Sequence, residues 1–164
     1  TGELILDLNL LGTFYNQAGE IVGVSSIGLP MNSLLPSESS PFDLAVLTSL
    51  DKVADWTIQV DHSASRSVDT PSLELSIQGE IITPEEYKWT ITGEAVNNSD
   101  QDLTMVLVVA GLRETGTGEL VGLTYKLKPG EFPVGSSIPY DLKISPDLSL
   151  DPTKLESFVI VRAR

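Results

Sequence analysis

A histidine beside an aspartate, with serines elsewhere, is the combination that Ser-His-Asp hydrolases use. The chain has one histidine, His62, next to Asp61, and many serines. No Gly-x-Ser-x-Gly motif, the turn that exposes a nucleophilic serine, accompanies them. Cysteine is absent, which excludes cysteine nucleophiles, thiolate zinc sites and disulfides. We therefore predict that the chain is not an enzyme and has no catalytic residues.

Carboxylates offer two other kinds of chemistry. Glycosidases need two carboxylates set about a sugar ring, but pairs such as Glu85 and Glu86 arise by chance in an acidic sequence. Calcium prefers oxygen ligands on loops, and Asn97, Asp100 and Asp102 are the candidates here. EF-hand spacing is absent, and the alternative is a turn in which Asn and Asp side chains bind their own backbone. We favour the turn, and calcium is the only cofactor that we consider.

Aromatic side chains raise the hypothesis of carbohydrate binding. Six of them could stack on sugars if they were exposed together: Tyr15, Trp56, Tyr87, Trp89, Tyr125 and Tyr140. Trp89 lies in register with Ile91, and Trp56 with Ile58, so we expect both indoles to point into a core. Tyr87, flanked by charged residues, is the best candidate for an exposed ligand-binding ring.

The charge balance narrows the possible partners. The 164 residues include 23 acidic and 10 basic side chains, for a net charge of −13 and a pI near 4.2. Such a surface repels phosphate backbones and anionic lipids, so nucleic acid is not an expected partner. No apolar run approaches the roughly 18 residues that span a bilayer, so direct membrane insertion is not expected either.

The elements that must position these residues occur twice. Residues 4–24 align without a gap onto residues 103–123, at a constant offset of 99 (103 − 4). Gly12 and Gly23 thereby meet Gly111 and Gly122, and further on Pro-Phe-Asp-Leu at 41–44 meets Pro-Tyr-Asp-Leu at 139–142. A repeat of this length predicts two copies of one domain.

Period-two alternation and Gly/Pro turns predict strands in both copies. The first copy has four: one that starts at residue 4, then 20–27, 42–47 and 56–60. The second has six: 73–77, 88–96, 103–112, 119–127, 140–144 and 158–161. The polar stretch 62–71 is the predicted linker. We predict an all-β fold of two tandem immunoglobulin-like antiparallel β-sandwiches, at residues 1–64 and 65–164.

The two predicted copies are unequal. A unit of four strands has raw edges and a thin core, so either the sequence was excised inside this domain or another surface completes it. Residues 103–112 are apolar on both faces and must be central in a sheet, whereas 73–77 could lie at an edge and add to a neighbour's sheet. We expect a protein partner or a homodimer formed by pairing of edge strands.

The sequence Gly-Glu-Ala-Val-Asn-Asn-Ser at 93–99, with the apolar strand, Gly turn and Pro-containing crossing after it, resembles the FxLYD family. In the first copy Phe14-Tyr15-Asn16 stands where that family has Leu-Tyr-Asp, whereas Arg113-Glu114-Thr115 departs from it in the second. The resemblance covers most of residues 73–164 and, less completely, 4–61. It implies immunoglobulin-like modules of exported bacterial and archaeal proteins, without catalytic residues.

These observations lead to one expected function and one alternative. The expected function is a non-enzymatic extracytoplasmic module, secreted, periplasmic or on the cell surface, with a structural or protein-interaction role. The alternative is a carbohydrate-binding β-sandwich, which would need a row of exposed, coplanar aromatic rings.

Overall fold

The structure is a computed structural model that describes residues 2–31, 33–34, 38–62, 64–68, 75–145 and 150–163. The chain divides into two compact units, Thr1–Asp69 and Thr70–Arg164, and each unit is described by itself. Strands dominate both, and the helical turns in the described residues are the two short 3₁₀ segments η1 (Leu50–Lys52) and η2 (Pro152–Lys154). The all-β expectation is confirmed.

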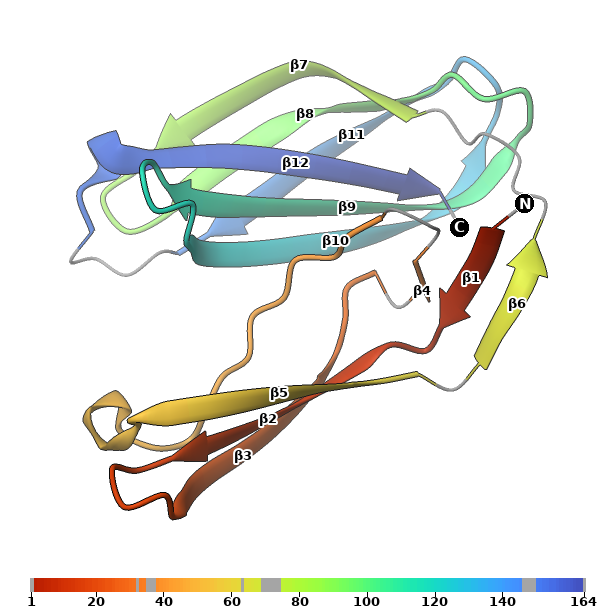
Figure 1. Cartoon of the computed structure of the whole chain (residues 1–164). Coiled ribbons are helices and arrows are strands. Elements are labelled where there is room, and N and C mark those ends of the chain that lie inside the picture. The colour runs from red at the N-terminus through yellow and green to blue at the C-terminus, as the bar shows by residue number, and fades with distance from the viewer. Residues whose placement is uncertain are drawn as a thin grey trace. The chain divides into compact units, whose positions relative to one another are not determined.

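The second unit is a complete sandwich. Its described strands are β7 (Leu75–Pro84), β8 (Trp89–Asn97), β9 (Leu103–Glu114), β10 (Leu120–Phe132), β11 (Ser137–Ile144) and β12 (Leu155–Ala163). They form two antiparallel sheets, ordered β11-β8-β7 and β10-β9-β12, which Figure 1 shows as two layers. The chain crosses between the sheets after β8, β10 and β11, as in immunoglobulin-like sandwiches. As predicted, β9 is central and β7 is an edge strand.

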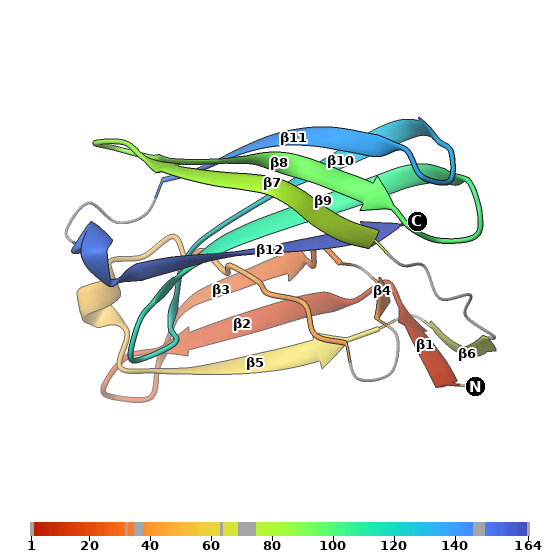
Figure 2. The ribbon, with the colours of Figure 1, turned by 90° about the horizontal axis from the view of Figure 1, so that it is seen from above.

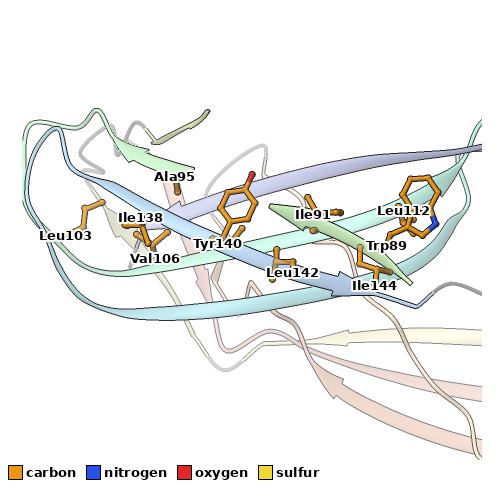
Figure 3. Close-up of a cluster of buried hydrophobic side chains, with 12 residues drawn as sticks. Trp89, Ile91, Ala95, Leu103, Val106, Leu112, Ile138, Tyr140, Leu142 and Ile144 are labelled. Carbon is orange, nitrogen blue, oxygen red and sulfur yellow. The ribbon is translucent and has the colours of Figure 1, made fainter. Parts of the chain in front are cut away.

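Alternation builds the core between these two sheets. Every second residue of β11 is buried, and β8 contributes Trp89, Ile91 and Ala95 to the same layer. The opposing sheet contributes Val106 and other apolar residues of β9 (Figure 3). The prediction of an inward Trp89 is therefore confirmed.

The first unit repeats one of these sheets, and its other described strands continue that sheet's strand order in a shorter piece. Its described strands are β1 (Gly2–Leu6), β2 (Asn9–Tyr15), β3 (Ile21–Gly28), β4 (Ser33–Leu34), β5 (Asp55–Asp61) and β6 (Ala64–Val68). The sheet β3-β2-β5 has the strand order of β10-β9-β12, whereas β4-β1-β6 is a short ribbon (Figure 2). This ribbon continues the order because β1 pairs with β6 in the same register in which β2 pairs with β5.

The registers correct the gapless alignment of the two copies. Gly23 pairs with Phe14, but Gly122 pairs with Leu112, not with Arg113 as the offset of 99 requires. The offset over β2 and β9 is therefore 98 (112 − 14). The hairpin turns explain the difference, because the N–H of Asn16 bonds to the carbonyl of Glu20, whereas the N–H of Glu114 reaches one residue further, to Glu119.

Three expectations for the first copy were wrong. The strand expected from residue 4 onward is two strands, because Asp7 takes a positive φ of 53° and turns the chain between β1 and β2. Residues 42–47 form no strand: residues 42–46 belong to no regular element, residue 47 lies in a bend, and no described strand pairs with them. The expected linker at 62–71 contains β6, which pairs with β1, so this unit includes strand pairing beyond residue 64.

Tyr140 is closely packed in the core of the second unit. Its ring lies against Gly93, where an added Cβ would come within 2.5 Å of the Tyr140 hydroxyl oxygen. That hydroxyl is buried without a hydrogen-bond partner in the described part of the chain. Burial, with a smaller contribution from Glu80, raises the pKa of Tyr140 to about 12. The aligned residue of the first copy is Phe42, which has no hydroxyl.

Tyr140→Phe should leave the neutral-pH free energy of unfolding unchanged or raise it by up to about 1 kcal/mol, because an unpaired buried polar group is removed. The native-state pKa of Tyr140 lies above the unfolded value near 10, so the wild type loses stability as pH rises from about 10 through 12. The variant should lack this part of the loss. Urea unfolding at pH 7 and pH 11 in a Trp56→Phe background, followed by Trp89 fluorescence, checks both points. Tyr125→Phe, at an exposed ring, is the neutral-pH control.

Candidate functional site

The predicted calcium candidates lie in the β8–β9 loop, where Asn97 is a fully buried structural residue. Its amide nitrogen donates to the carbonyls of Gln101 (3.0 Å) and Phe132 (2.9 Å). Its amide oxygen accepts from the backbone N–H and the hydroxyl of Ser99. Both ends of the side chain are engaged, which agrees with the interpretation of the loop as a self-bonded turn.

The two aspartates of this loop do not join Asn97 in a cluster. Asp102 accepts the N–H of Val134 (3.0 Å) and ties the loop to the β10–β11 turn, while Asp100 is exposed. No group of three or more His, Asp or Glu side chains among the described residues is placed to hold a metal ion. Calcium binding stays the alternative to the turn, and titration can test it.

Tyr87 lies in the β7–β8 turn and is exposed, with 61% of its surface accessible. Its hydroxyl donates to Glu86 (2.6 Å), which raises the pKa of Tyr87. Next to it, Glu85 accepts from Thr90 (2.7 Å) and pairs with Lys88 (3.2 Å), and these contacts lower the pKa of Glu85. The neighbouring indole of Trp89 is in the core, so Tyr87 does not form a stacking platform with it.

A shallow hollow of about 470 Å³ lies at the β2–β3 end of the first unit. Its lining residues are Tyr15, Asn16, Gln17, Gly19, Ala54, Asp55 and Thr57. Several of its polar groups hold the turns: the Asn16 amide oxygen accepts the N–H groups of Ala18 and Glu20, and Asp55 accepts the N–H of Trp56. Tyr15 is the only ring in this lining.

His62 is exposed, and Asp61 accepts its backbone N–H (2.9 Å) instead of its imidazole. The contact is a local turn at the end of β5 and not the buried base-orienting pair of a catalytic triad.

The feature that sequence reasoning missed is the inner face of the β3-β2-β5 sheet. Leu10, Gly12 and Phe14 of β2 point to this face, and their register partners in β5 are Val60, Ile58 and Trp56 in turn. Opposite residues of an antiparallel pair share a face, so all six belong to the layer that a second sheet would cover.

Residues 42–47 cover the β2–β3 half of this inner face. A Cβ added at Gly12 would collide with a methyl group of Leu44, and one added at Gly23 would come within 2.5 Å of the Val46 Cγ2. In the second unit a Cβ added at Gly122 would likewise come within 2.5 Å of the Ile144 Cγ2. Residues 42–47 therefore occupy the place of β11 in the first unit.

No described strand takes the place that β8 has beside β11. No backbone hydrogen bond joins residues 42–47 to another described residue, so their N–H and C=O groups form an open edge. Side chains on the β5 side of this face, and Phe42 itself, are uncovered: Trp56 is 58% exposed, Val60 is 59% exposed, and Phe42 is 36% exposed.

The second unit shows what the same positions look like when they are covered. Val161 of β12 pairs with Val108 of the central strand β9, and Val60 of β5 pairs with Leu10 of the central strand β2. Val108 and Leu10 are matching positions, so Val161 corresponds to Val60. Val161 packs on the core cluster, and Tyr140, which corresponds to Phe42, is buried. The expectation that Trp56 points inward was right about its face and wrong about its burial, because none of the described elements covers the β5 side of that face.

The described part of the chain contains no helix long and apolar enough to cross a membrane. No protein-family model matches the chain, and no curated protein sequence matches it.

Asn97→Ala should lower the free energy of unfolding of the second unit by about 2–4 kcal/mol, because buried groups of the loop and of Phe132 lose their partners. Asn98→Ala is the matched control. Asn98 is exposed and bonds only to the Ser76 hydroxyl among described partners, so we expect a loss below about 1 kcal/mol. Urea unfolding measures both. A rise in melting temperature of several degrees with millimolar calcium, abolished by Asp100→Asn, would contradict the turn interpretation.

Gly23→Ala and Val46→Ala test whether residues 42–47 pack as described. Gly23→Ala should cost about 1–3 kcal/mol through its clash with Val46, and Val46→Ala about 1–2 kcal/mol through lost burial. The double variant should cost less than the sum, because the shortened side chain makes room for the new methyl. Gly28→Ala, whose Cβ would be 3.5 Å from its nearest neighbour, is the control. Additive losses would show that the contact is not formed.

Proposed function

We propose that the chain is a non-enzymatic extracytoplasmic module whose role is structural or lies in binding another protein. The single observation that carries this proposal is the contrast between the units. One is a closed sandwich, and the other exposes Trp56, Val60 and Phe42 beside an unpaired edge. Exposed apolar positions next to free backbone groups are a recurring feature of surfaces that bind polypeptide segments.

The arrangement of polar side chains supports the non-enzymatic part. Glu85 and Glu86 are exposed in the β7–β8 turn, and their described partners are the local groups of Thr90, Lys88 and Tyr87. His62 and Asp61 meet through the backbone.

The resemblance to the FxLYD family supports the extracytoplasmic part. The residues that carry it include Phe14-Tyr15-Asn16 in β2 and its turn, and the Gly-Glu-Ala-Val-Asn-Asn-Ser segment at 93–99. Asn97 and Ser99 hydrogen-bond to each other and stabilise their loop, which is a structural role that a sandwich module would require of these motif residues. A bacterial or archaeal exported protein is the source that this resemblance suggests.

Carbohydrate binding is the second candidate, and the hollow beside Tyr15 is the observation that favours it. A sugar could stack on this ring and meet the carboxylate of Asp55. A glycan array probed with the chain and with Tyr15→Ala separates the two candidates. Specific hits lost in Tyr15→Ala favour the sugar site, and no hits favour the protein-binding role.

Protease accessibility in the native host tests the extracytoplasmic role. The protein, expressed from its own gene with a tag inserted at the exposed turn around Gly116, should be cleaved when protease is added to intact cells or to cells with a permeabilised outer layer. If the tagged protein stays in the cytoplasm and is not cleaved under either condition, the proposal is contradicted. A tagged cytoplasmic enzyme, which should stay uncleaved, is the control.

A further inference from the structure

We infer that the open inner face of the first unit is a strand-docking site for an extended segment of a partner protein. The segment pairs with residues 42–47 and covers Phe42, Trp56 and Val60. The inference deepens the proposed interaction role and rests on it. The space is defined by what the second unit places there, namely β8.

The pairing of β11 with β8 defines the direction and register of the guest. Ile144, Leu142 and Tyr140 pair with Trp89, Ile91 and Gly93, and the two strands are antiparallel. The corresponding residues of the first unit are Val46, Leu44 and Phe42. A guest strand therefore runs antiparallel to residues 42–47 and offers an inward side chain to each of these three positions.

The same register defines the guest's side chains. Over Phe42 the guest needs glycine or another small residue, because Gly93 is what leaves room for the Tyr140 ring. Over Leu44 and Val46 it can carry large apolar residues, as Ile91 and Trp89 show. In the guest's own direction this gives large-x-large-x-small, the pattern Trp-Thr-Ile-Thr-Gly at 89–93.

Charge favours a different protein over a second copy of this chain. Residues 1–69 contain nine acidic and two basic side chains, a net of −7 (2 − 9). Asp43, Asp55 and Asp61 are exposed on the elements that border the open face. Two copies would bring these charges together, whereas a guest with Lys or Arg at its outward positions or ends would be attracted.

The probe is a synthetic peptide with the sequence of residues 87–97, in which Trp89 is replaced by Phe and two lysines follow the last residue. Binding to the full 164-residue chain is measured by fluorescence polarisation of the labelled peptide. The emission of Trp56 should shift to shorter wavelength as its indole is covered, while Trp89 of the protein is already buried.

Trp56→Ala should weaken peptide binding by about tenfold or more, because the indole is the largest side chain of the open face. Tyr87→Ala, at an exposed ring of the other unit, is the matched control and should leave binding unchanged. A peptide with Val at the position of Gly93 should bind at least about tenfold more weakly, and a scrambled peptide should not bind. Absence of binding by the parent peptide, or equal binding by the Gly93→Val peptide, overturns the inference.

Two further measurements distinguish the other occupants. Light scattering that shows a dimer, dissolved by Trp56→Ala, would assign the face to a second copy and overturn the partner inference. The second measurement compares peptide binding by residues 1–164 with binding by the protein made from its own gene. Binding by the first and not by the second would assign the face to another part of the same polypeptide and overturn the partner inference. Protease accessibility tests the extracytoplasmic location independently of peptide binding. A negative result for docking therefore does not contradict that location.

Discussion

A β-sheet with one apolar face is stable only when a second layer covers that face, and this requirement explains most of the structure. In the second unit two three-stranded sheets meet this requirement for each other. The core between them includes Ile91 from one sheet and Val106, Val108 and Ala110 from the other, all with no exposed surface. In the described part of the first unit, residues 42–47 are the segment that lies over the β2–β3 half of the sheet, and the apolar exposure is found on the β5 side.

Glycines set how closely the second layer approaches the first. Val46 rests on Gly23, and Ile144 rests on Gly122, at aligned positions of the two units. The repeated glycines are thus explained by a contact across the sandwich, in addition to the turn glycines such as Gly19 and Gly118, which take positive φ. One contact persists in both units although only one of them has a complete second sheet.

The sequence was sufficient to predict elements whose alternation is strong and whose partners are near in the chain. The β9–β10 hairpin, the edge position of β7 and the burial of Trp89 all followed from local patterns. Residues 42–47 show why such patterns fail elsewhere. Their alternation matches that of β11, but a strand also needs a hydrogen-bonded neighbour. The sequence of the segment does not indicate whether such a neighbour exists.

The candidate site was invisible in the sequence for a related reason. The period of two correctly placed Trp56 on the same face as Ile58, yet burial depends on what lies above that face. The hairpin turn of the second copy is one residue longer than that of the first. The gapless alignment ignored this difference and therefore placed Gly12 on Gly111. In the structure Gly12 accommodates Leu44, whereas Gly111 accommodates the ring of Phe158 on β12.

Two of the edges in the described part of the chain differ in how well they resist pairing with another strand. On β7, Gly79 takes a positive φ inside a bulge, Glu80 adds a charge, and Pro84 removes a donor, all of which discourage pairing with another strand. Residues 42–47 contain no glycine, proline or lysine, and Asp43 is their only charge. Because residues 42–47 otherwise lack these features, nothing else in their own sequence discourages pairing with another strand.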